Sequence, residues 1–498
     1  MKIVWRMAGG MMCLSALFIF GGCQTAPVSN VNSTATTGTP APAPSASATP
    51  ATMGASANNL PVTLPVLDAM FADEKFAGDL KSQLQLTDEQ IASLRKMARE
   101  ETAGLRESET GEHSGTTTTA TTRAAEQIKS VLGDERAGRF SEFVSARWAT
   151  GGGESGGGTA DTATAGANPA TGSGGSGQPN GVPTDTRIVV NAPAYRMDVF
   201  ENGQLVKSYK VGIGYPEFPL PVGMRKANTL IFNPTWTPPD EPWVESPTSK
   251  VKVGEKVAAG SPLNPLGPIK IPIGLPSLIH GGKAQAKLGG FASHGCVGLT
   301  NAQVQDVARV MSKLGGGAGL TDEDMATYAK NRTETKEVKL DKAVPVELRY
   351  ETIVVEDDGK LHIYRDVYDR DTNTEEKLRA VLSAAGVSMD SLTEAERTKV
   401  MNALKQMARD ATGKPTDGAP PTASPSATPA AGGTANKNAK AKTDAESNKV
   451  TRTIKGQKEI IIELAALKGK GYPAPVALDT GSGAAKKSTA ATTKKKSV

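Results

Sequence analysis

The chain of 498 residues is poor in cysteine, in aromatic side chains and in net charge. Three cysteines in so long a chain exclude a fold held together by disulfide bonds. Aromatic residues make up only 4% of the chain, while 53 glycines and 32 prolines interrupt it, so a large part cannot form packed core. The net charge of +5 is too small to indicate nucleic-acid binding. We therefore expect few folded domains, separated by linkers.

The first 23 residues have the pattern of an export signal. Two basic residues precede an apolar run from Met11 to Phe20, which is too short for a membrane-spanning helix. Cys23 follows two glycines, and this end of the run resembles the lipobox of bacterial lipoproteins, although Phe20 stands where leucine is usual. The resemblance implies a membrane anchor through a lipid on Cys23 and, with Gln24 next, a periplasmic protein at the outer membrane. Ordinary cleavage and release is the alternative.

Residue patterns divide the rest of the chain into helical, β and low-complexity segments. In the first of these, Thr87 followed by Gln90 predicts a capped helix start. Further along, short β-type runs alternate with proline-rich loops, and Asn202-Gly203 predicts a tight hairpin in an antiparallel β domain. The expected division is a signal peptide with a lipobox-like end at 1–23, a disordered tether at 24–59, a helical segment at 60–148, a Gly/Ser/Thr linker at 149–183, the β domain at 184–371, a short helical segment at 372–411 and a low-complexity, lysine-rich tail at 412–498.

The candidate chemistry lies around one thiol. Once a signal is removed and its cysteine acylated, Cys296 is the only free thiol, and two of the four histidines, His280 and His294, lie within 16 residues of it. A thiol is only partly ionised at neutral pH, so a nucleophilic cysteine needs an imidazole or another positive group nearby. Gly281 and Gly295 allow the backbone to present amide N–H groups to an oxyanion.

These residues belong to a longer motif. His280-Gly281, a spacer and then the run from Ser293 to Asn301 (Ser-His-Gly-Cys-Val-Gly-Leu-Thr-Asn) resemble the signature of L,D-transpeptidase catalytic domains of the YkuD type. That signature reads HG, a spacer, SHGC, an aliphatic residue and finally Asn. The resemblance covers about 184 to 371. It departs at Gly298, where many members carry arginine, and this leaves the choice of donor or acceptor open.

The resemblance implies a fold and a set of roles. The fold is a mainly β catalytic domain, β-sandwich-like, with a short helix after the catalytic loop, and small helical segments and long disordered linkers flank it. Cys296 matches the nucleophile and His280 the base that activates it. The amides of Gly295 and Cys296 match the oxyanion hole. The other matched positions shape the loop or bind substrate: Gly281, Ser293, His294 and Asn301.

The substrate implied by the resemblance is the tetrapeptide stem of peptidoglycan. The thiolate expels the terminal D-Ala and forms a thioester, which an amine of a second stem or of a lipoprotein then resolves. No cofactor, metal or nucleic acid is expected. Three alternatives stay open: an L,D-carboxypeptidase that uses water as acceptor, a non-catalytic wall-binding lipoprotein, and a zinc site made of His280, His294 and Cys296. We interpret His113 and His362 as bystanders.

Overall fold

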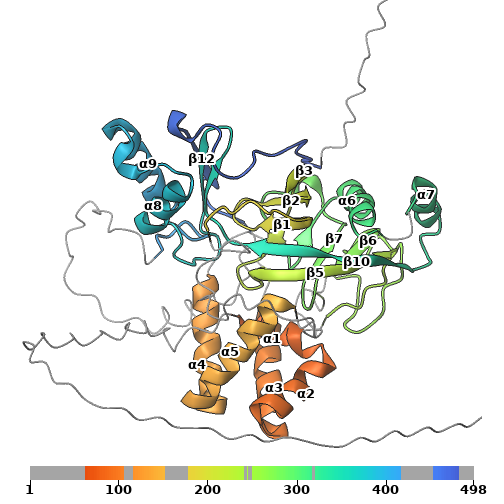
Figure 1. The fold of residues 1–498 in the computed structure, drawn as a ribbon. Helices are drawn as coiled ribbons and strands as arrows, with labels where there is room; N and C mark the ends of the chain where they lie inside the picture. The colour runs from red at the N-terminus through yellow and green to blue at the C-terminus, as the bar shows by residue number, and fades with distance from the viewer. Residues whose placement is uncertain are drawn as a thin grey trace, which may run out of the picture. The chain divides into compact units, whose positions relative to one another are not determined.

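The computed structural model describes residues 62–105, 116–151, 178–239, 244, 249–316, 320–416 and 453–481 (Figure 1). The predicted export signal and tether, Cys23, His113 and the lysines after 485 lie outside these residues. Within the described ranges, no helix is both long and apolar enough to cross a membrane.

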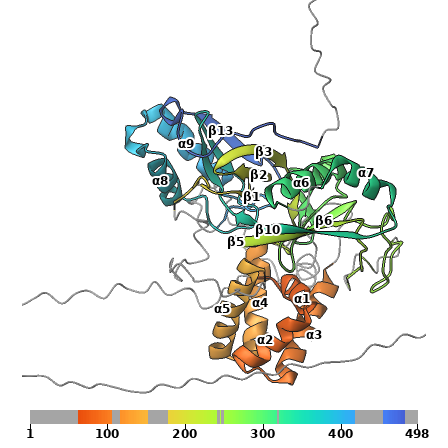
Figure 2. The ribbon, with the colours of Figure 1, turned by 45° about the vertical axis from the view of Figure 1, so that its right-hand side comes forward.

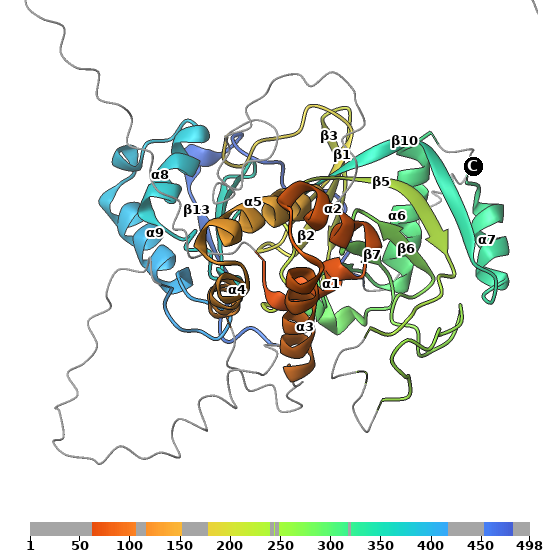
Figure 3. The ribbon, with the colours of Figure 1, turned by 90° about the horizontal axis from the view of Figure 1, so that it is seen from below.

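The first described part is helical, as predicted for 60–148. Its core is formed by fully buried apolar side chains, among them Phe76, Leu80, Leu94 and Phe140. Thr87 caps its helix through a reciprocal pair of hydrogen bonds with Gln90, so the predicted capping box is confirmed. Figure 3 shows these helices from below. They are α1 (Leu64–Phe71), α2 (Glu74–Leu84), α3 (Asp88–Gly104), α4 (Thr117–Leu132) and α5 (Asp134–Thr150).

The central part is built on a sheet whose strands follow the order β3-β2-β1-β10-β5-β6-β7-β9. The long strands β5 and β10 run side by side in its middle (Figure 3). The strands are β1 (Arg187–Asn191), β2 (Arg196–Glu201), β3 (Gln204–Lys210), β5 (Gly223–Phe232), β6 (Ile269–Pro272), β7 (Leu278–His280), β9 (Val297–Gly298) and β10 (Lys336–Arg349), and β4 (Ile213–Gly214) pairs separately with β8 (Phe291–Ser293).

The hairpin was predicted correctly, but the strand directions only in part. Asn202 and Gly203 join β2 to β3 with positive φ angles of 52° and 79°, which the turn requires. The expectation of an antiparallel domain is wrong for three pairs: β1 runs parallel to β10, β7 to β9 and β4 to β8. Each parallel pair joins strands that are distant along the chain, and alternating hydrophobicity does not reveal which strands become neighbours.

Helix α6 (Asn301–Leu314) follows the last strand of the catalytic loop, as predicted. It buries Val304, Val307, Ala308 and Met311 in the same apolar core as β6 and β10 (Figure 2). Thr300 caps it through a second capping box. This helix, α7 (Asp322–Lys330) and the short 3-10 turn η1 (Gln285–Lys287) complete the central part. The predicted fold class, a mainly β catalytic domain with a helix after the catalytic loop and flanking helical segments, is confirmed.

The C-terminal part corrects two predicted boundaries. A three-stranded sheet in the order β11-β12-β13 shares one apolar core with α8 and α9. Figure 2 shows α8, α9 and β13 side by side. Its first two strands were assigned to the β domain ending at 371, and its last strand falls in the segment interpreted as a low-complexity tail from 412. The elements are β11 (Ile353–Glu356), β12 (Lys360–Tyr364), α8 (Glu375–Ala384), η2 (Met389–Ser391), α9 (Glu394–Met407), β13 (Glu459–Glu463) and η3 (Ala465–Leu467).

The segment after β13 also returns to the central sheet. The amides of Ser208 and Lys210 on β3 donate to the carbonyls of Val476 and Asp479, and the Asp479 amide donates back to Ser208. These bonds cover the exposed edge of β3, which otherwise presents unpaired backbone groups. A tail interpretation is therefore wrong for 453–481.

Candidate active site

Two parallel strands bring the motif residues together. In the pairing of β7 with β9, Ile279 lies opposite Val297 and His280 opposite Gly298. Backbone hydrogen bonds extend this contact: the Leu299 amide donates to the His280 carbonyl at 2.9 Å. Cys296 immediately precedes β9, one residue before the Val297 that pairs with Ile279. The pairing therefore unites residues that are 16 positions apart in the sequence.

Ser293 shapes the loop that presents the thiol. Its hydroxyl donates to the Cys296 carbonyl at 2.6 Å and accepts from the Cys296 amide at 3.0 Å. Between them Gly295 has φ +89°, a conformation that side-chain-bearing residues rarely adopt. The loop is thus a tight turn that leaves Cys296 partly exposed.

The Cys296 amide was expected to form half of an oxyanion hole. Here it is engaged by the Ser293 hydroxyl, so it can serve a developing oxyanion only if that bond is exchanged.

His280 is buried and its imidazole is neutral at physiological pH. Burial is the main cause that lowers its pKa to about 3, and the nearby charge of Lys283 acts in the same direction. Its Nδ1 lies 2.7 Å from the Gly281 carbonyl oxygen. A carbonyl oxygen only accepts, so Nδ1 donates its proton to Gly281, and the backbone of Leu266 also hydrogen-bonds the ring.

His294 is held by aromatic rings. Its imidazole makes edge-to-face contacts with Phe218, at 4.7 Å between ring centroids, and with Tyr215, at 5.1 Å. Burial and the charge of Lys283 lower its pKa to about 3. These contacts fix the position of the His294 ring within the loop.

Asn301 ties the two halves of the motif together. Its Oδ1 accepts a hydrogen bond of 2.7 Å from the Gly282 amide, so the start of α6 holds the loop that follows β7. A Cβ atom at Gly281 would come within 2.8 Å of a methyl group of Val304 and 3.0 Å of Asn301 Oδ1, so this glycine is needed for close packing. The structure thus shows Asn301, predicted in substrate binding, making a loop contact.

The structure does not support the zinc alternative. The described residues include no group of three or more His, Cys, Asp or Glu side chains placed to hold a metal ion. His294 contacts Tyr215 and Phe218 through the faces and edges of their rings.

Sequence reasoning missed Lys283, whose charge acts on both histidines of the motif. The signal was present, because Lys283 comes three residues after His280. The sequence alone did not show that Lys283 lies beside the thiol loop. The pairing of β7 with β9 brings it there, and its amide donates to the Leu299 carbonyl at 3.0 Å.

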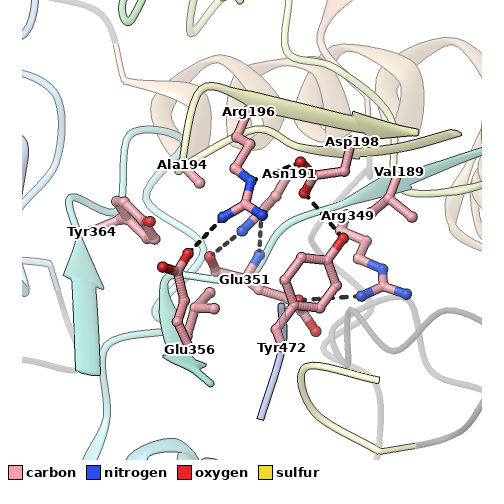
Figure 4. Close-up of a pocket in the computed structure, with 11 residues that line it drawn as sticks. Val189, Asn191, Ala194, Arg196, Asp198, Arg349, Glu351, Glu356, Tyr364 and Tyr472 are labelled. Carbon is pink, nitrogen blue, oxygen red and sulfur yellow. Dashed lines mark hydrogen bonds and ion pairs between the residues drawn. The ribbon is translucent and has the colours of Figure 1, made fainter. Parts of the chain in front are cut away.

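A second group of polar residues lies apart from the motif. Figure 4 shows a buried ion-pair cluster in which Arg196 extends between Asp198, at 2.8 Å, and Glu356, at 2.5 Å. Tyr472 donates to Asp198, and Arg349 pairs with Glu347. His362, interpreted as a bystander, ion-pairs with Glu356 and Glu459. The cluster joins strands of the central and C-terminal sheets, since Arg196 lies on β2 and Glu356 on β11.

Comparison with known proteins agrees with the motif. Residues 185–337 match the model of the YkuD family, described as the L,D-transpeptidase catalytic domain, and these residues include both His280 and Cys296. No curated protein matches the chain. Over these residues, which are less than half of the chain, the sequence is similar to the YkuD catalytic domain. The predicted recognition is confirmed, and the central sheet continues past the matched residues to the end of β10.

Three solved structures of L,D-transpeptidases, two of them of an Enterococcus faecium enzyme, are similar to this chain. The catalytic domain of an Enterococcus faecium L,D-transpeptidase has 17% identity and a TM-score of 0.21, covering 34% of this chain and 99% of that one. A longer structure of the E. faecium enzyme has 16% identity and a TM-score of 0.21, covering 33% and 49%. An L,D-transpeptidase from Mycobacterium smegmatis has 15% identity and a TM-score of 0.20, covering 33% and 58%. The match thus spans about half of the longer relatives.

Proposed function

We propose that this protein is a cysteine-dependent L,D-transpeptidase that acts on tetrapeptide stems of peptidoglycan. L,D-transpeptidases act on such stems. The observation that supports the proposal most is the family match across His280 and Cys296. The β7–β9 pairing adds to it, because His280 ends β7 and Cys296 comes one residue before the Val297 that pairs with Ile279.

In the first half of the reaction, His280 accepts the thiol proton at Nε2 and the thiolate of Cys296 attacks the carbonyl of the third stem residue. The bond to the terminal D-Ala breaks, and the leaving amine takes the proton back from the imidazole. The product is a thioester on Cys296. A neutral imidazole suits this role because it can accept the proton, and burial keeps His280 neutral.

In the second half, an amine of another stem attacks the thioester and forms the cross-link while the thiol is restored. A lipoprotein amine is the other acceptor considered. The exchange of one amide for another requires no ATP and no cofactor. The oxyanion in both halves is assigned to the amides of Gly295 and Cys296, after the Cys296 amide releases the Ser293 hydroxyl.

The test is incubation of the purified protein with defined tetrapeptide muropeptides. Cross-linked dimers and free D-Ala are expected from the wild type. Trimmed tripeptide monomers without dimers would replace the transpeptidase proposal with the carboxypeptidase alternative. If the protein releases no D-Ala and forms no acyl-enzyme, both enzymatic interpretations are refuted and the non-catalytic wall-binding lipoprotein remains.

The variants Cys296→Ala and His280→Ala test the assigned roles. We expect Cys296→Ala to lose product and covalent acyl-enzyme, as read by intact mass. His280→Ala should lose about a hundredfold or more in rate, the contribution of a positioned base. Lys287→Met, on the exposed η1 turn of the same loop, is the matched control and should keep wild-type turnover. Full activity of Cys296→Ala would refute the mechanism.

We further propose that Cys23 is lipidated and anchors the protein at the outer membrane, facing the periplasm. The lipobox-like sequence before Cys23 and the Gln24 after it support this location. Cys23→Ser should move the protein from the membrane fraction to the soluble periplasmic fraction. An N-terminal peptide without acyl mass, with fractionation unchanged by Cys23→Ser, would contradict the anchor.

A further inference from the structure

Lys283 fills the space beside the catalytic loop that a side chain at position 298 would occupy. A Cβ atom built on Gly298 would lie 2.8 Å from Lys283 Cγ and 3.1 Å from its Cε. The first distance is one that real Cβ contacts essentially never show and the second is tighter than most, so a residue larger than glycine at 298 would require the Lys283 side chain to move. Gly298 is therefore the partner that lets Lys283 lie against β9.

Position 298 lies two residues after Cys296. Cys296 lies in the bend that precedes β9, and its charge interacts with that of Lys283, so the two side chains lie close enough to act on each other. The Lys283 amide donates to the Leu299 carbonyl at 3.0 Å, so the Lys283 backbone lies beside the residue that follows Gly298. Lys283 thus reaches the nucleophile from the β7 loop.

The positive charge of the site resides on this lysine. Both imidazoles of the motif are neutral, with pKa values lowered to about 3 by burial and by Lys283 itself. Burial lowers the pKa of Lys283, and its interaction with Cys296 acts in the opposite direction. Within the described ranges Lys283 forms no ion pair with a carboxylate, so its charge is not neutralised by an acidic neighbour.

We propose that Lys283 is the cation that stabilises the thiolate of Cys296, with Gly298 making room for it. Lys283 is then a positioning residue that acts through the nucleophile. This role of Lys283 depends on the proposed function in one respect only, the identification of Cys296 as the nucleophile. Position 298, where many family members carry arginine, is glycine in this chain, and the side chain next to it is Lys283.

The experiment measures the rate of Cys296 alkylation by iodoacetamide from pH 5 to 10 on the purified protein. Only the thiolate reacts, so the midpoint of the pH profile reports its stability, and peptide mass assigns the adduct to Cys296. Removal of an opposite charge at close range shifts such a midpoint by about one unit or more. Lys283→Met should therefore raise the midpoint by about one unit and slow alkylation at pH 7 several-fold.

Two variants separate loss of charge from loss of structure. Lys283→Arg should keep the wild-type midpoint. In the double variant Lys283→Ala/Gly298→Arg, the removed stem frees the space over position 298, and the arginine restores a cation beside the thiol loop. This double variant should return the midpoint to within about 0.3 units of the wild type, a small fraction of the shift expected from one charge.

Lys287→Met is the matched control, since it removes the same charge from the exposed η1 turn of that loop. Its midpoint should stay at the wild-type value. Gly298→Ala tests the position of the lysine without removing its charge. The new methyl group displaces the aliphatic part of the Lys283 side chain, so the alkylation midpoint should rise.

An unchanged midpoint in Lys283→Met, or an equal shift in Lys287→Met, would overturn the inference. Failure of the double variant to recover would also count against it, because a cation beside the thiol loop would then be insufficient. The assay uses no muropeptide. A wild type that alkylates as expected but releases no D-Ala would refute the proposed function and leave the role of Lys283 standing.

Discussion

Protonation of His362 should stabilise the C-terminal sheet in a pH-dependent way. Its Nδ1 lies 2.5 Å from Glu459 Oε1 and its Nε2 lies 3.2 Å from Glu356 Oε2. Both nitrogens can donate only when the ring is charged. Burial opposes that charge, but the two carboxylates outweigh it and raise the pKa of His362 from 6.5 to about 9. Glu356 lies on β11, His362 on β12 and Glu459 on β13, so the charge holds three strands together.

The magnitude follows from the shift. Each pKa unit is worth about 1.4 kcal/mol, so the raised pKa contributes about 3 kcal/mol of stability. The folded value lies above the unfolded one, so this contribution is fully present below pH 6.5. It declines from there and is lost as the pH rises through about 9.

Hydrogen exchange of the β11–β13 amides measures this effect locally, which matters because a chain with several parts need not unfold in one step. After correction for the intrinsic exchange rate, His362→Gln should lower the opening free energy by about 3 kcal/mol at pH 6. At pH 9.5 the difference should fall below about 1 kcal/mol. Lys360→Gln, on the same strand, is the control without a titration in this window. Equal losses in His362→Gln at both pH values would refute the reasoning.

Two further predictions concern the catalytic loop. Asn301→Ala removes the acceptor for the Gly282 amide, so the loop after His280 loses its hydrogen bond to the start of α6. The free energy of unfolding should fall by about 1 kcal/mol. Turnover should fall by more than this loss of stability explains, because the loop positions His280. Thermal unfolding and muropeptide turnover check this, and unchanged turnover would contradict it. Gly295→Ala should reduce turnover because φ is +89° there, whereas Gly290→Ala, whose new Cβ would meet only Lys458 Nζ at 3.4 Å, should be tolerated. Equal activity of the two variants would show that the left-handed conformation is not needed.

Features that depend on neighbouring residues were readable from the sequence. Asn202-Gly203 predicts its hairpin because its side chains suit positive φ, and Thr87 and Gln90 satisfy helix-end amides within one turn. The catalytic loop was also found this way. Its residues from Ser293 to Asn301 lie in one short run, and the family match includes them.

Pairings between distant segments were decided only by the tertiary structure. Strand β13 joins β12 from beyond a long low-complexity tract, because Ile462 completes a core that α8 and α9 leave open. No local sequence pattern predicts which strand β13 pairs with. The free energy that stabilises this pairing comes from burial against residues far along the chain.

The charged groups near Cys296 and near His362 also show what the sequence determined and what the tertiary structure decided. The sequence determined by itself that Cys296 and His280 belong to one motif. Only folding placed Lys283 over Gly298, and only folding brought Glu356 and Glu459 to His362, which therefore carries a charge that its strand position alone does not predict. A side chain's protonation depends on the charges and the solvent around it, and these are set by which segments pack together.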